Sequence, residues 1–103
     1  MAVLQVGLID VHPGREADFE RDLPGVIWRL VKADGCKAVN IVRSLEKPSR
    51  YRMLVSWESK DHHVAFRKTE TVVPLKAMLA SYAAARHDTE HVTAVFSTRN
   101  IID

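Results

Sequence analysis

The extended segments of this chain are apolar on both faces, and this property most limits the folds open to it. Residues 2–11 predict a strand, because they are rich in β-branched residues and are followed by Pro13-Gly14. The strand carries Val3, Ile9 and Val11 on one face and Leu4, Val6 and Leu8 on the other. A sheet with one face in water would alternate more cleanly between apolar and polar residues. Helices can cover only one face here, so a second copy of the sheet is the simplest cover for the other.

The remaining segments predict an α+β domain of the ferredoxin-like kind, with the order β-α-β-β-α-β and a four-stranded antiparallel sheet. Pro24-Gly25 should kink or break the first helical stretch, because proline removes a helical hydrogen bond. Asp34-Gly35 should end that stretch, and Ser59 should cap the next helix. The expected strands are 2–11, 37–44, 50–58 and 91–97, and the expected helical stretches are 13–33, 60–68 and 71–86.

The length, net charge, cysteine count and hydropathy of the chain exclude several classes of protein. A chain of 103 residues is long enough for one domain, spanning 1–103, and too short for two. Its net charge of +2 comes from scattered lysines and arginines, so nucleic acid is not an expected partner. Cys36 is the single cysteine and cannot form an internal disulfide. No apolar run approaches the ~20 residues of a membrane span, and residues 1–10 lack the pattern of a signal peptide. We therefore expect a cytoplasmic protein with no membrane partner.

Three stretches together resemble the antibiotic biosynthesis monooxygenase family. Residues 12–20 (HPGREADFE) are similar to its entry into the first helix, and residues 34–36 (DGC) to its helix exit. Residues 46–67 contain EKPSRY, VSWES, Asp61-His62 and Phe66-Arg67 in the family's order and spacing. The resemblance covers about residues 3–97. It implies a homodimeric α+β barrel with a pocket between each sheet and its helices. It also implies oxidation of aromatic polyketides or quinols by O2, often without flavin, haem or metal.

An oxygenase without a cofactor has a definite chemical requirement. Oxygen reacts poorly with closed-shell organic molecules, so the substrate must supply an electron, and a phenolate or enolate does so far better than its neutral form. The protein must therefore remove a proton, hold the anion and exclude bulk water. We look for a base, a cation or hydrogen-bond donor, and an aromatic-lined pocket.

His62 and Arg67 are the candidate catalytic residues. An ordinary histidine pKa of ~6.5 suits proton transfer near neutral pH, and His62 lies one helical turn before Phe66, so both can face the sheet. The guanidinium of Arg67 could steady an oxyanion. The alternatives are a histidine that packs locally and a surface arginine paired with an acid.

Aromatic and amide side chains supply the candidate substrate-binding residues. Trp57, Phe66 and Tyr82 could line the pocket, and the tyrosine hydroxyl could orient a substrate. Asn40 could donate to a substrate oxygen from the middle of its strand. The alternative for the aromatic residues is plain core, and for Asn40 an exposed sheet position.

Metal and haem chemistry fit the sequence poorly, so no cofactor is expected. The segment 87–91 (HDTEH) matches an H-x-x-E-H zinc pattern, but it should cross from helix to strand, where its two histidines cannot share one helix face. Haem-degrading relatives use asparagine, tryptophan and histidine where this chain has Gly7, Phe66 and Lys76.

The functional hypothesis is a cofactor-independent monooxygenase that oxidises a small phenolic, quinol or polycyclic aromatic substrate with O2. The alternatives are a non-catalytic small-molecule-binding or scaffolding barrel, and an isomerase or decarboxylase on the same fold.

Overall fold

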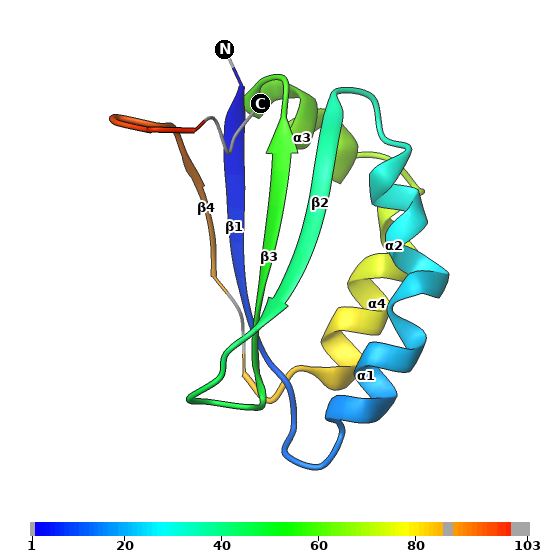
Figure 1. Cartoon of the computed structure of the whole chain (residues 1–103). Helices are drawn as coiled ribbons and strands as arrows, with labels where there is room; N and C mark the ends of the chain where they lie inside the picture. Colours follow the sequence, from blue (N-terminus) through cyan, green and yellow to red (C-terminus); the bar gives the residue numbers. More distant parts are fainter. Residues whose placement is uncertain (1, 86–87, 100–103) are drawn as a thin grey trace.

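A computed structural model describes residues 2–85 and 88–99, which form one antiparallel sheet with helices on one of its sides (Figure 1). The sheet order is β2-β3-β1-β4. The predicted α+β class and its four-stranded antiparallel sheet are confirmed. The strands are β1 (Val3–Asp10), β2 (Cys36–Arg43), β3 (Arg50–Trp57) and β4 (Thr89–Val92), and the helices are α1 (Glu16–Asp22), α2 (Pro24–Val31), α3 (Lys60–Arg67) and α4 (Val72–Tyr82). None of the described helices combines the length and apolar character needed to cross a bilayer.

Proline and glycine punctuate the helices as expected. The first helical stretch divides at Leu23, and Pro24 begins α2, where its missing N–H removes no helical hydrogen bond. Gly35 follows α2 and has a backbone φ of 82°, a value that residues with a Cβ rarely adopt. These residues set the angle at which the chain leaves the helix layer and enters β2.

The last strand lies earlier in the chain than predicted. A strand was expected over 91–97, but β4 covers Thr89–Val92 and pairs only with β1. Val92 lies opposite Leu4, so an antiparallel continuation past Val92 would soon run beyond the start of β1. Val95 and Phe96 are accordingly exposed, at 99% and 86%. The strand β4 therefore ends where its partner β1 begins.

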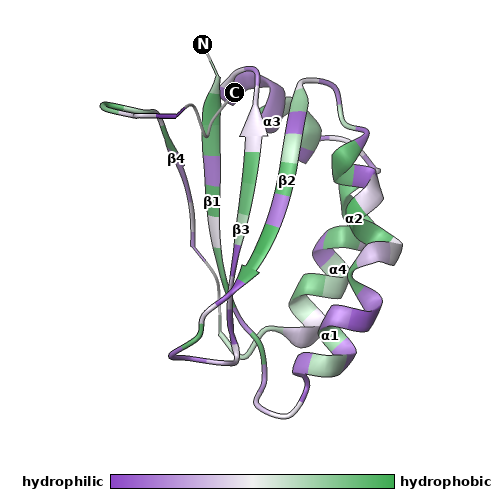
Figure 2. Ribbon diagram, in the orientation of Figure 1, coloured by the Kyte–Doolittle hydropathy of each residue, from purple (hydrophilic) through white to green (hydrophobic). Residues whose placement is uncertain are grey.

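The core lies between the sheet and the helix layer. The sheet contributes the inward side chains of β1 and β3, and α2 packs against α4 above them. Hydrophobic residues occur along the strands and on α2 and α4, whereas α1 and α3 are more hydrophilic (Figure 2). The largest fully buried side chains are Trp57, Phe19, Ile9, Leu30, Val11 and Val55.

The opposite face of the sheet has an apolar patch centred on β1, with the polar Asn40 and Arg52 on the neighbouring strands, and none of the described helices covers it. Leu4, Val6 and Leu8 of β1 alternate with the core residues, are half-buried, and lie beside Leu54 of β3. All four described helices lie on the other side (Figure 1). A homodimer that covers this face stays a prediction.

Candidate active site

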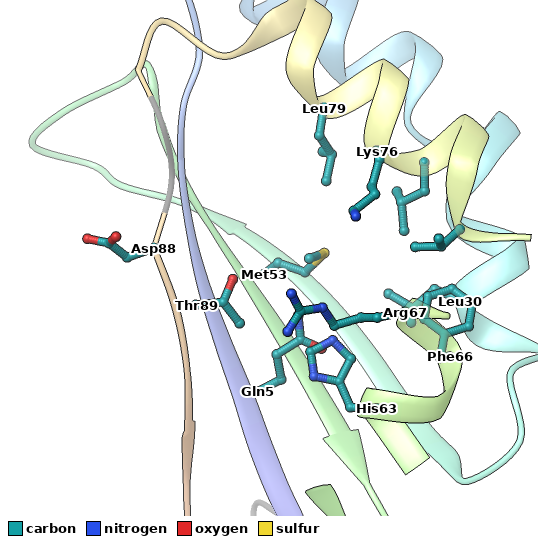
Figure 3. A pocket seen from close by; sticks show the side chains of 12 residues that line it. Gln5, Leu30, Met53, His63, Phe66, Arg67, Lys76, Leu79, Asp88 and Thr89 are labelled. Carbon is teal, nitrogen blue, oxygen red and sulfur yellow. The ribbon is translucent and has the colours of Figure 1, made fainter. Parts of the chain in front are cut away.

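A cleft of about 520 Å³ lies between the inner face of the sheet and helices α3 and α4 (Figure 3). Each neighbouring element contributes to it: β1 provides Gln5, β3 Met53, α3 His63, Phe66 and Arg67, α4 Leu75, Lys76 and Leu79, and β4 Thr89. Lys76 and Leu79 project from α4 toward the sheet, and Arg67 extends beside His63 and Gln5 (Figure 3). The cleft combines apolar walls with a few polar groups, which is typical of a small-molecule site.

Ser59 decides which way α3 presents its two adjacent histidines. Its hydroxyl caps the helix by accepting a hydrogen bond from the backbone N–H of His62 at 3.3 Å. The same oxygen lies 2.7 Å from Nδ1 of the His62 ring. This hydrogen bond holds His62 near the end of β3, next to Gly35, where a Cβ would lie 2.3 Å from the ring. His63 is consequently turned toward the sheet.

His63 is the buried titratable residue of the cleft, with 5% of its surface exposed. Its ring stacks on Trp57 with centroids 5.1 Å apart and planes 24° apart. Its Nδ1 lies 2.7 Å from Nε2 of His91, on β4, so one ring donates a hydrogen bond to the other. No hydrogen bond to Nε2 of His63 is found among the described residues.

The surroundings of His63 keep it neutral. Burial lowers its pKa from 6.5 to about 4, and the charges of His91 and Arg67 act in the same direction. The pKa of His91 is also lowered, first by burial and then by Lys60 and Arg67. Both imidazoles are therefore uncharged near pH 7, and each can accept a proton.

Besides His63, the polar side chains that line the cleft are the cations Arg67 and Lys76, the carboxylate of Asp88, Gln5 and Thr89. Arg67 and Lys76 are exposed, and both line the cleft. Gln5 is buried, and its Oε1 accepts a hydrogen bond of 2.9 Å from Nε1 of Trp57. This bond fixes the tryptophan that supports His63. The arrangement can bind an anion, accept its proton and keep part of an aromatic ligand away from water.

The structure brings together three of the residues proposed from sequence. Phe66 and Arg67 line the cleft, and Trp57 lies beneath it through its contacts with His63 and Phe66. Their catalytic and binding roles stay predictions.

The other three lie elsewhere. His62 lines a separate cavity beside α2, so it does not face the sheet as its spacing from Phe66 suggested. Tyr82 is buried, and its hydroxyl donates to Asp22. Asn40 is exposed on β2 and lines none of the described cavities.

Several functional residues were not proposed from sequence. Gln5, His63 and Lys76 line the cleft, and His91 lies behind it in contact with His63. Gln5 carried a signal, because it is the one polar side chain among the inward residues of β1. His63 lies three residues before Phe66, a spacing that also shares a helix face. His91 and Lys76 come close through the tertiary fold, and no local pattern indicates that.

No cluster of three or more metal-binding side chains occurs in the part of the chain that the structure describes. His87, the first residue of the zinc-like pattern, lies outside the described residues, and His91 pairs with His63.

A family model and several solved structures match this chain. The family model described as antibiotic biosynthesis monooxygenase matches residues 2–75. A candidate antibiotic biosynthesis monooxygenase of Bordetella bronchiseptica is 32% identical, with a TM-score of 0.86 over 92% of this chain and 98% of that one. SnoaB, a cofactor-independent oxygenase from Streptomyces nogalater, is 18% identical, with a TM-score of 0.84 over 96% and 98%. A conserved protein from Methanosarcina mazei is 17% identical, with a TM-score of 0.80 over 89% and 91%. No functionally curated protein matches the chain.

Proposed function

Because the chain belongs to the antibiotic biosynthesis monooxygenase family, we propose that it is a cofactor-independent oxygenase that oxidises a small phenolic or quinol with O2. One observation carries the proposal: a buried, neutral His63 lies in a ligand-sized cleft beside the cation Arg67. This pairs a proton acceptor with a group that stabilises the resulting anion, which are the two requirements of such chemistry. The cofactor-independent oxygenase from Streptomyces nogalater shares the fold and supports the reaction class.

The first step is transfer of the substrate hydroxyl proton to Nε2 of His63. This requires the tautomer in which Nδ1 of His63 carries hydrogen and donates it to Nε2 of His91. A pKa of about 4 makes His63 a weak base by itself, but the substrate oxyanion next to it raises that pKa as the proton arrives. Arg67 and Lys76 line the same cleft and stabilise the oxyanion.

The second stage is oxidation of the bound anion. The anion gives one electron to O2, forming superoxide and a substrate radical, and their recombination forms a carbon–oxygen bond. The peroxide takes up a proton, and at a carbon that carries hydrogen it then loses water to leave a carbonyl. Both oxygen atoms are accounted for, one in the product and one in water. Trp57 and Phe66 supply the apolar wall that keeps bulk water from the peroxide.

His91 gives the proton a route out of the cleft. As His63 accepts the substrate proton at Nε2, it can pass the proton on Nδ1 to His91. His91 is more exposed than His63, because it lies on the edge strand β4. The pair therefore links the buried cleft with solvent and returns His63 to its neutral form.

The oxygenase is proposed to work as a homodimer. The uncovered face of the sheet presents Leu4, Val6 and Leu8, and a second copy would bury these side chains. The cleft lies on the opposite, helix-covered side of the sheet, so each protomer keeps its own set of cleft residues.

Oxygen uptake tests the function and separates the two candidate bases. We expect the protein, treated with a chelator, to consume O2 with at least one member of a panel of hydroquinones and polycyclic phenols. His63→Gln should lower turnover by roughly 10²–10⁴-fold, as loss of a general base does. His62→Gln is the competing test, and His12→Gln, in an exposed loop, is the control for general effects of histidine removal. Full turnover in His63→Gln would remove His63 from the mechanism. Substrate binding without oxygen uptake would instead favour a binding protein.

A further inference from the structure

A second cavity, of about 380 Å³, lies beside α3, where this helix packs near α2. It is lined by Trp28 and Arg29 of α2, by Lys32 at the C-cap of that helix, and by His62 and Phe66 of α3. The proposed reaction uses none of the polar groups in this cavity. Phe66 is the residue that lines both this cavity and the cleft.

The cations of this cavity lack acidic partners. Arg29 and Lys32 form no ion pair with any described residue, although the carboxylate of Asp34 also lines the cavity. The Nε of Arg29 is buried and has no hydrogen-bond partner among the described residues. Such a donor is unfavourable, because it has lost water and gained nothing in return. Two cations face one carboxylate, so the cavity favours a negatively charged ligand.

The rest of the lining combines the aromatic and apolar side chains of Trp28, Ala33, Ala65 and Phe66 with the polar side chains of His62, Thr69 and Thr71. The Arg29 guanidinium lies 4.9 Å from the centre of the Trp28 ring, and the Lys32 ammonium lies 5.2 Å from it. A ligand here would therefore contact ring faces and cations together, with Phe66 on the α3 side. An anion with a planar apolar body matches this lining better than a fully hydrated ion does.

We propose that this cavity is a second binding site, specific for a small aromatic carboxylate. The carboxylate binds Arg29 through the fork of guanidinium donors and Lys32 through its point charge. The ring of the ligand packs between Trp28 and Phe66. The proposal does not depend on the oxygenase activity, because its residues and its test concern binding alone.

The test is titration with 2-naphthoate, followed by calorimetry and tryptophan fluorescence. Binding should quench the fluorescence of Trp28, and the quench should disappear in Trp28→Phe, which retains Trp57 as the remaining tryptophan. Arg29→Met keeps most of the side-chain volume and removes both the charge and the unpaired donor. It should weaken binding tenfold or more without lowering the melting temperature.

Three controls decide where and what the site binds. Lys47→Met, in an exposed loop, removes a charge elsewhere and should bind as the unaltered protein does. Arg67→Met removes one of the two cations of the cleft, and unchanged affinity in this variant supports the second cavity, whereas loss of binding would overturn the proposal. The neutral 2-naphthamide should bind at least tenfold more weakly. Any one of four results would overturn the proposal: the amide binds as tightly as the carboxylate, inorganic phosphate binds as tightly, Arg29→Met binds with unchanged affinity, or naphthoate shows no saturable binding at low millimolar concentration.

Discussion

The burial of a neutral His63 makes the stability of this protein depend on pH in a defined window. The folded state holds the pKa of His63 at about 4, whereas the ordinary value is 6.5. Between pH 6.5 and pH 4, His63 is therefore mostly protonated in the unfolded chain and mostly neutral in the folded chain. The resulting contribution to stability is complete above pH 6.5 and is lost as pH falls from 6.5 toward 4.

The magnitude follows from the two pKa values. A difference of one pKa unit corresponds to about 1.4 kcal/mol, so lowering the pH from 7 to 5 should reduce the free energy of unfolding by about 2 kcal/mol through His63 alone. His91 acts in the same direction, because its pKa is also lowered. Asp10, Glu16 and Asp22 have lowered pKa values too, but their unfolded values of 3.8, 4.5 and 3.8 place their losses below pH 5.

Urea unfolding at pH 7 and pH 5, at one fixed protein concentration, measures this loss. Circular dichroism is the suitable signal, because tryptophan fluorescence would report Trp57 directly beside the histidine. His63→Gln should be less stable at pH 7, since the stacking on Trp57 is removed, but it should lose much less stability on going to pH 5. Equal losses in the two proteins, within about 0.5 kcal/mol, would refute the reasoning.

Two further predictions concern the fold and its assembly. Gly35→Ala should lower the free energy of unfolding by about 2 kcal/mol or more, because the new Cβ would lie 2.3 Å from the His62 ring and the backbone has a φ of 82°. Gly25→Ala is the control, because its new Cβ would contact nothing within 4 Å. Equal melting temperatures for the two variants would contradict the argument. Val6→Asp, on the uncovered face of the sheet, should convert the dimer into a monomer of 11.6 kDa in sedimentation equilibrium. Val73→Asp, at an exposed position of α4, is the control and should leave the dimer intact. A monomeric unaltered protein would refute the predicted dimer.

The fold could be read from the sequence because its signals are local. Pro24 begins a helix, Gly35 takes a positive φ and Ser59 caps α3, and each acts through its own backbone or its near neighbours. The end of β4 could not be predicted in this way. Val95 belongs to an apolar stretch with strand character, but its pairing depends on where β1 begins, which is 92 positions away in the chain.

The site shows the same division more sharply. Helical spacing places both His62 and His63 within a turn of Phe66, and adjacent helical residues differ by about 100° in direction. Periodicity therefore cannot choose between them. The choice depends on Ser59, which hydrogen-bonds to one ring, and on Trp57, whose flat face is available to the other. The Ser59 contact is local but acts on a side-chain ring rather than through periodicity, and the stacking on Trp57 exists only once the strand and the helix have docked.

The position of His91 on β4 couples the chemistry of the cleft to the least protected edge of the sheet. This strand has four residues and pairs on one side only, through the rungs from Gly7 to Leu4. If those rungs open, His63 loses its hydrogen-bond partner, water reaches its ring, and its pKa rises back toward the ordinary value. The pKa of His63 therefore depends on whether β4 is paired with β1. A local opening that leaves the rest of the core intact would change a weak buried base into an ordinary histidine.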